Sequence, residues 1–129
     1  MRLLLDTQAL LWFLNGSERL QEAARNLILE EDNEVLVSAA SLWEIAIKAS
    51  VGKLELRRPF RELFPDQLSS NGIDVLPIMP EHLSGLVNLP FHHRDPFDRL
   101  IIAQAISEHL PIVTSDPTFQ QYPVEVIGT

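Results

Sequence analysis

Cysteine is absent from this 129-residue sequence, and its four histidines form no recognisable metal-binding pattern. Without cysteine the chain can contain neither disulfides nor the thiolate ligands of structural zinc and iron–sulfur clusters. No His-x-x-x-His pair and no His-Glu-x-x-His motif occurs, so the helix of a zinc hydrolase is not indicated. Metal chemistry in this protein would have to come from other residues.

Long apolar segments are absent as well. No apolar run approaches the roughly 20 residues needed to cross a bilayer. The apolar start at Leu3 is interrupted at Asp6, which is not the pattern of a signal peptide. We therefore expect a cytoplasmic protein with no membrane partner. The length and the hydrophobic content of 46% predict one folded domain over residues 1–129.

Positive charge is scarce: 10 lysines and arginines stand against 18 acidic residues, for a net charge of −8. This balance argues against a nucleic-acid partner. The distribution is uneven, however, because six acids fall between Glu18 and Glu34 while most basic residues gather in two groups elsewhere. The first group is Lys48, Lys53, Arg57, Arg58 and Arg61, and the second is His92, His93, Arg94 and Arg99. Both groups are either solvated faces or surfaces that hold phosphates or an acidic segment of a partner.

Strand-like and helix-like segments alternate along the chain, judged from apolar pattern and capping residues. The expected strands cover residues 2–6, 35–37, 73–78, 112–114 and 124–127. The expected helices cover residues 7–15, 38–50, 59–71, 81–87 and 96–109, with one more that begins at a Ser17 cap and runs through Ile28. Such alternation favours an α/β fold, with three α/β/α layers around a mostly parallel central sheet.

Four acidic residues stand where a carboxylate is energetically awkward. Asp6 and Asp116 each follow an apolar strand, at the edge of a parallel sheet where ligands bind. Glu44 lies in a helix with apolar residues on nearly every face, and Asp98 lies in the first turn of the most hydrophobic helix. Carboxylates in apolar surroundings are costly unless something neutralises them. Their placement predicts one shared cation site.

Each acid also has a purely structural explanation, which the sequence leaves open. Asp6 can cap the helix that follows it, and Asp98 can close a capping box. Glu44 can pair with Lys48, which follows four residues later on the same helix face. Asp116 precedes a proline and can form a turn by bonding to its own backbone.

Four stretches of the sequence carry a more specific pattern: residues 4–7, 38–45, 93–105 and 113–116. The most specific is Arg-Asp-Pro-Phe-Asp-Arg at 94–99 with its Ile-Ala-Gln-Ala tail at 102–105. In these stretches, and in their order and spacing, the chain resembles the PIN-domain family. It is most similar to the VapC-type ribonuclease toxins of bacterial toxin–antitoxin pairs. The resemblance spans nearly the whole chain and implies a PIN-like fold.

The resemblance also implies a Mg²⁺- or Mn²⁺-dependent endoribonuclease that is usually dimeric and is blocked by a cognate antitoxin. The acidic quartet of the family maps onto Asp6, Glu44, Asp98 and Asp116. Because Mg²⁺ keeps several waters, one or two direct carboxylates suffice. We expect Asp6 and Asp98 to be the direct ligands. Glu44 and Asp116 would then hold waters of the ion, or a second ion.

Further residues have expected supporting roles around the quartet. Asp95 is explained by helix capping and is also a candidate fifth acid of the site. The candidate hydrogen-bond donors to the ligands are Thr7, Thr114 and Ser115. The residues expected to contact RNA or the antitoxin are Lys48, Lys53, Arg57, Arg58 and Arg94.

Three other classes compete with this interpretation. A haloacid-dehalogenase-like phosphatase would need a second aspartate two residues after Asp6, where this chain has Gln8. A receiver-like signalling domain would need an aspartate at the end of the middle strand, and the segment from Val75 to Met79 has none. A degenerate PIN fold that only binds a partner would not need the intact quartet.

Overall fold

A five-stranded parallel sheet forms the centre of the computed structural model, which describes residues 1–129. The strand order is β3-β2-β1-β4-β5, and all four neighbouring pairs are parallel. The strands are β1 (Arg2–Leu5), β2 (Glu34–Ser38), β3 (Ile73–Leu76), β4 (Ile112–Val113) and β5 (Val126–Ile127). The predicted α/β class is confirmed, and the sheet is entirely rather than mostly parallel.

The apolar runs of the inner strands reflect a sheet that is covered on both faces. Along β1, Leu3 and Leu5 point into one hydrophobic cluster while Leu4 points into the other. In β2, Val37 and Leu36 divide between the two clusters in the same way. A parallel strand buried on both sides reads as a continuous apolar run, because neither face needs polar residues.

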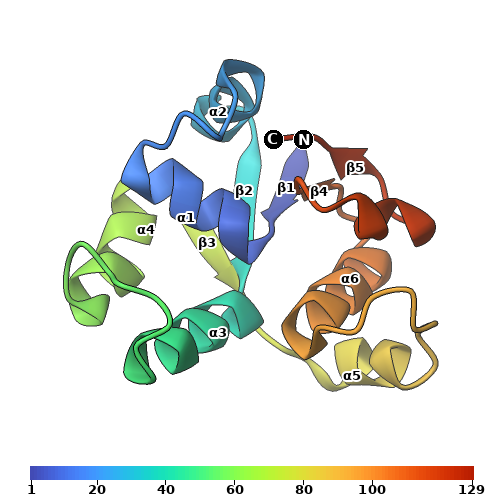
Figure 1. The fold of residues 1–129 in the computed structure, drawn as a ribbon. Helices are drawn as coiled ribbons and strands as arrows, with labels where there is room; N and C mark the ends of the chain where they lie inside the picture. The colour runs from blue at the N-terminus through green and yellow to red at the C-terminus, as the bar shows by residue number, and fades with distance from the viewer.

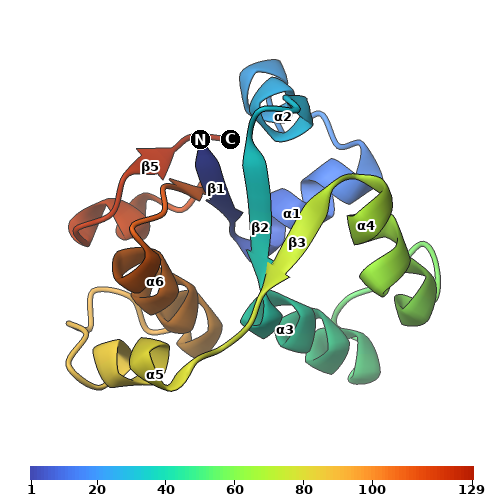
Figure 2. The same ribbon diagram turned by 180° about the vertical axis from the view of Figure 1, so that it is seen from behind.

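Helices lie on both faces of the sheet and beside the carboxyl ends of its strands. They are α1 (Thr7–Asn15), α2 (Glu22–Leu29), α3 (Ala39–Ser50), α4 (Leu68–Ser70), α5 (Pro80–Val87) and α6 (Pro96–Glu108), with a short π-helical segment η1 (Glu62–Gln67) and a 3₁₀ helix η2 (Pro117–Gln121). Helices α1 and α2 cover one face of the sheet and α6 covers the other, as Figures 1 and 2 show from opposite sides. Helix α3 lies beside the carboxyl ends of β2 and β3. No helix combines the length and apolar character of a membrane span.

Aspartate caps fix the starts of α1 and α6 at the carboxyl ends of the strands. Asp6 directly follows β1 and accepts a hydrogen bond from the Ala9 N–H, so α1 starts one residue after the strand ends. Asp95 accepts hydrogen bonds from the N–H groups of Phe97 and Asp98 and so begins α6. These bonds satisfy backbone donors that have no partner inside the helix.

Two predicted helices differ from the observed ones for physical reasons. The helix expected over residues 59–71 is broken at Phe64, whose backbone is extended (φ −131°, ψ 116°). Pro65 follows it, and proline disfavours the helical conformation of the residue before it. The prediction that Ser17 caps the second helix was also wrong. Helix α2 begins at Glu22, and the Ser17 hydroxyl instead accepts a hydrogen bond from the Arg19 N–H.

Candidate active site

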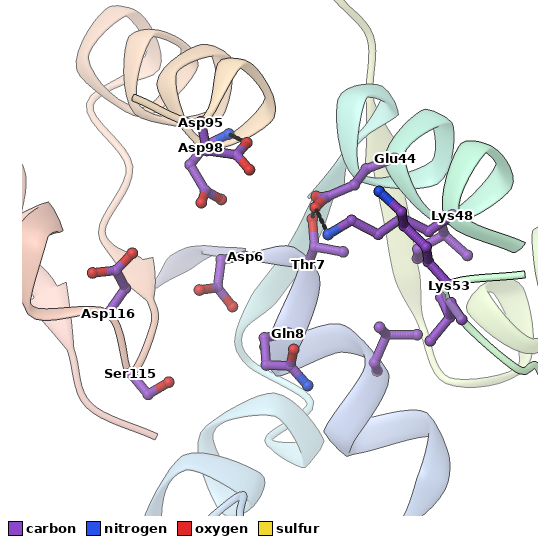
Figure 3. Close-up of a pocket in the computed structure, with 13 residues that line it drawn as sticks. Asp6, Thr7, Gln8, Glu44, Lys48, Lys53, Asp95, Asp98, Ser115 and Asp116 are labelled. Carbon is purple, nitrogen blue, oxygen red and sulfur yellow. Dashed lines mark hydrogen bonds and ion pairs between the residues drawn. The ribbon is translucent and has the colours of Figure 1, made fainter. Parts of the chain in front are cut away.

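A pocket of about 350 Å³ opens at the carboxyl edge of the sheet and gathers all four acids of the predicted quartet. Asp6 reaches it from the end of β1, Glu44 from α3, Asp98 from the first turn of α6, and Asp116 from the loop after β4 (Figure 3). Thr7, Asp95 and Ser115 also line the pocket. Residues as far apart in sequence as 6 and 116 therefore share one cavity.

Asp6 is buried more deeply than Asp116, the other acid that follows a strand. Its residue is 5% exposed, and each of its two oxygens accepts one hydrogen bond. Oδ1 accepts from the Ala9 N–H at 2.8 Å, and Oδ2 accepts from the Thr114 hydroxyl at 2.6 Å. Burial raises the pKa of Asp6, and the nearby charges of Asp116 and Glu44 raise it further, against the lowering effect of the hydrogen bonds. Because a carboxylate oxygen has about two lone pairs, each Asp6 oxygen keeps one that no hydrogen bond uses.

Glu44 is held on both oxygens by neighbours that the sequence also singled out. The Thr7 hydroxyl donates to Oε1 at 2.7 Å and lies 2.9 Å from the Ser41 hydroxyl. The Lys48 ammonium donates to Oε2 at 2.6 Å, and this hydrogen bond is the main cause of the raised pKa of Lys48. The structural explanation offered by the sequence, a Glu44–Lys48 pair, is therefore observed. The pair lies inside the pocket rather than away from it.

Asp98 is the least compensated of the four acids. Burial raises its pKa from 3.8 to about 7, and the adjacent charge of Asp95 adds to the shift. Its only side-chain partner is the Nε2 atom of His93, at 3.2 Å from Oδ2. Asp98 does not close a capping box, because the Asp95 N–H is taken by the Nδ1 atom of His93. The first turn of α6 therefore presents Asp98 to the pocket without using it as a cap.

Asp116 completes the site from the opposite side. Its Oδ1 accepts from the Thr118 N–H at 2.9 Å, and its Oδ2 lies 2.7 Å from His93 Nε2. Burial alone would raise the pKa of Asp116, but these bonds from Thr118 and His93 bring it below the ordinary value. Asp116 and Asp98 thus have pKa values pushed in opposite directions, a pattern typical of paired groups in catalytic sites.

The structural explanations and the site do not exclude each other. Asp6 caps α1 and Asp116 makes the turn at Pro117, as the alternatives required, yet both carboxylates line the pocket. A carboxylate has about four lone-pair directions, so one or two N–H contacts leave room for a cation. Asp95 accepts hydrogen bonds from two N–H groups with its Oδ1 atom and lines the same pocket.

The composition of the pocket suits a hard divalent cation. Its acids offer only oxygen donors, the ligands that Mg²⁺ and Mn²⁺ prefer. Burial is the main cause of the raised pKa values of Asp6 and Asp98, and the charges of neighbouring acids raise both further. Apart from His93, Lys48 is the only basic residue that pairs with an acid of the quartet. A bound cation would relieve the repulsion that remains.

The predicted basic contacts separate into residues in the pocket and residues outside it. Lys48 and Lys53 line the pocket beside Glu44 (Figure 3). Arg57 donates to the Asn15 carbonyl at the end of α1, and Arg58 pairs with Glu62 at 3.5 Å. Arg94 lines a separate surface hollow together with Val87, Phe91 and Arg99.

The second basic group is not one charged face, and here the sequence interpretation was wrong. Arg99 is buried and donates to the carbonyls of Leu89, Pro90 and His93. His93 turns inward between Asp98 and Asp116. Sequence reasoning missed the contacts of His93 with two acids of the quartet. Its position two residues before the helix cap Asp95 was the available signal, because a ring nitrogen there can accept the N–H of the cap.

Comparison with known proteins agrees with this geometry. The model of the PIN domain family matches residues 3–125 of the chain. The chain is 33% identical to ribonuclease VapC22 of Mycobacterium tuberculosis over 114 residues, which cover 88% of this chain and 85% of that protein. Among solved structures it resembles VapBC2 from Rickettsia felis bound to a promoter DNA fragment, with a TM-score of 0.74, 17% identity and coverage of 99% of this chain and 98% of that one. It also resembles a toxin–antitoxin complex from Klebsiella pneumoniae, with a TM-score of 0.66, 16% identity and coverage of 96% and 94%.

Proposed function

Because this chain belongs to the PIN-domain family, as a relative of the VapC ribonucleases, we propose that it is a Mg²⁺- or Mn²⁺-dependent endoribonuclease and the toxin of a toxin–antitoxin pair. The observation that carries the proposal is the convergence of Asp6, Glu44, Asp98 and Asp116 in one pocket. Gln8 lines the same pocket at the position where a haloacid-dehalogenase-like phosphatase would need its second aspartate. This favours nuclease chemistry over that alternative.

The four acids have different parts in this proposal. Asp6 and Asp98 are the direct cation ligands, since Asp98 has one oxygen with no hydrogen bond and Asp6 keeps a free lone pair on each oxygen. Glu44 and Asp116 orient water around the cation, because each is already fixed by hydrogen bonds. When bound, the cation supplies positive charge for the scissile phosphate and lowers the pKa of water. Thr7 and Thr114 keep Glu44 and Asp6 in place.

The substrate enters along the basic side of the pocket in this proposal. Lys48 and Lys53 line the pocket and in this proposal meet phosphates that flank the scissile bond. Arg57, Arg58 and Arg94 lie outside the pocket and would meet more distant phosphates or an acidic antitoxin segment. The similar structure from Klebsiella pneumoniae is a toxin–antitoxin complex, and this supports an antitoxin as the protein partner. We infer further that the chain acts in the cytoplasm as a homodimer.

Cleavage of purified total RNA, with the new ends mapped by sequencing, tests the proposal. The wild-type protein should cut RNA at defined positions with Mg²⁺ or Mn²⁺ and should lose this activity in excess EDTA. Asp98→Asn keeps the shape of the side chain and removes the charge, so it should lower cleavage at least about 100-fold. Asp74→Asn, on an exposed position of β3, is the matched control and should cut like wild type. Full cleavage in EDTA, or an active Asp98→Asn, would contradict the proposal.

A further inference from the structure

His93 stands between two acids that come from different parts of the chain. Its Nε2 atom lies 2.7 Å from Asp116 Oδ2 and 3.2 Å from Asp98 Oδ2. Asp98 belongs to α6 and Asp116 to the loop after β4, and His93 meets both: it forms a hydrogen bond with Asp116 and makes a close contact with Asp98. The ring is mostly buried and packs edge-on against Phe119, with 5.6 Å between the ring centroids.

The other ring nitrogen fixes which hydrogen-bond role Nε2 can take. Nδ1 accepts a hydrogen bond from the Asp95 N–H at 3.1 Å. A backbone N–H can only donate, so Nδ1 carries no hydrogen and the ring hydrogen lies on Nε2. Nε2 therefore donates its one hydrogen to Asp116, with Asp98 Oδ2 close beside it. A ring held in this way cannot offer Nε2 as a lone-pair ligand to a metal, although the three side chains are close enough for a metal site.

The backbone of His93 is held as firmly as its ring. The His93 N–H donates to the Tyr122 hydroxyl at 2.8 Å, and that hydroxyl donates to the Pro90 carbonyl at 2.6 Å. The His93 carbonyl accepts from Arg99, whose guanidinium also binds the carbonyls of Leu89 and Pro90. Arg99 finds no carboxylate partner there, so its buried charge serves to hold this loop. The segment before α6 is thus built to keep the imidazole in one position.

We propose that His93 is a positioning residue of the nuclease site: its Nε2–H holds Asp98 and Asp116 at the spacing that the cation and the attacking water require. The inference rests on the proposed function for the identity of the reaction, and on the hydrogen bonds of the chain for the role of the residue. It differs from the role of a metal ligand, and from a structural role in capping α6 through Asp95.

Two substitutions separate the two nitrogens of the ring. The amide nitrogen of His93→Gln lies near the position of Nε2, so this variant keeps a donor to the acids and loses the acceptor for the Asp95 N–H. The amide oxygen of His93→Asn lies near the position of Nδ1, so this variant keeps the acceptor and loses the donor. We expect kcat to remain within about threefold of wild type in His93→Gln and to fall about 10–100-fold in His93→Asn, with little change in KM.

The same pair gives the opposite result if His93 only caps the helix. A structural role predicts an active and stable His93→Asn and a defective His93→Gln, and either that result or equal activity of the two variants would overturn the proposal. His92→Gln is the matched control, since His92 is exposed, contacts Tyr122 edge-on and forms no hydrogen bond with an acid. It should match wild type in cleavage and in melting temperature.

A spectroscopic measurement on the wild-type protein keeps the proposal testable even if a variant fails to fold or the chain cuts no RNA. ¹⁵N NMR of the imidazoles, assigned by comparison with His93→Gln, reports which ring nitrogen carries hydrogen. The expected result is hydrogen on Nε2 of His93, both in EDTA and with saturating Mg²⁺. Hydrogen on Nδ1, or loss of the Nε2 hydrogen when Mg²⁺ binds, would overturn the proposal and assign His93 as a ligand. Failure of the RNA assay alone would count only against the proposed reaction.

Discussion

Asp98 is the residue whose protonation the pocket alters most. Its pKa of about 7 follows first from burial and then from the charge of Asp95. The unfolded chain loses this proton near pH 3.8, so the folded protein binds one more proton than the unfolded chain between about pH 4 and 7. Stability must fall as pH rises through this window, because ionisation is harder in the folded state. This loss of folding stability is absent below about pH 4 and complete above about pH 7.

Asp98→Asn should therefore stabilise the metal-free protein at neutral pH, since the amide carries no charge. With EDTA present, we expect its free energy of unfolding to exceed that of wild type by about 2–4 kcal/mol at pH 8 and by about zero at pH 4. Urea unfolding of both proteins across this range measures the difference. A variant that is less stable than wild type at pH 8 would show that Asp98 supports the helix rather than burdens the site.

The residue scale also shows what sequence could and could not predict about the site. The inward direction of Asp98 followed from its spacing with Ile101 and Ala105, both of which are buried. The role of His93 did not follow, because its partner Asp116 is 23 residues away and only the folded chain brings them together. A helical or strand pattern reports which face of an element is buried, but not which polar groups meet across elements.

At the scale of elements, the ends of β1 and β4 are joined through the Thr114 hydroxyl. It donates to Asp6 Oδ2 at 2.6 Å and accepts from the Asp116 N–H at 3.0 Å. Thr114 is buried, whereas its neighbour Ser115 is exposed and its hydroxyl forms no hydrogen bond. The sequence offered the two residues as equal candidates, and the structure gives only Thr114 a contact with a site acid.

Thr114→Val should lower stability, because the valine keeps the shape and leaves the buried Asp6 carboxylate with one donor fewer. The expected loss is about 1–3 kcal/mol in the free energy of unfolding at neutral pH. Ser115→Ala serves as the control and should change the same quantity by less than about 0.5 kcal/mol. Thermal and urea melts in EDTA measure both, and equal effects of the two variants would mean that the Thr114 bond carries no stability.

The elements were predictable where local pattern decides them. Continuous apolar runs identified β1 and β2, and the Asp95-Pro96 start identified α6. Strands β4 and β5 were shorter than expected, with two residues each, and they pair with each other over only these two residues. The single helix expected over residues 59–71 does not form, because the chain is kinked at Phe64, before Pro65. The order of the strands in the sheet could not be predicted from the sequence, because it depends on which chain segments pack against which edge.

At the scale of the whole molecule, the net charge of −8 and the acidic pocket have one consequence in common. Two carboxylates about 5 Å apart at an effective dielectric of about 20 repel each other by roughly 3 kcal/mol. Part of this repulsion is relieved because the pKa of Asp98 is raised to about 7 and because Glu44 pairs with Lys48. The remaining charge makes cation binding favourable, and a cation also allows a negative protein to accept RNA phosphates at this place.

The central claim is that the four carboxylates act together as one cation site, and calorimetric titration with Mn²⁺ tests it most directly. Wild-type protein should bind Mn²⁺ in a saturable way, and its melting temperature should rise with the cation by mass action on the folded state. Asp98→Asn should bind at least about 10-fold more weakly, and the exposed control Asp74→Asn should bind like wild type. Absence of saturable binding to the wild-type protein, or equal affinity in Asp98→Asn, would contradict the account.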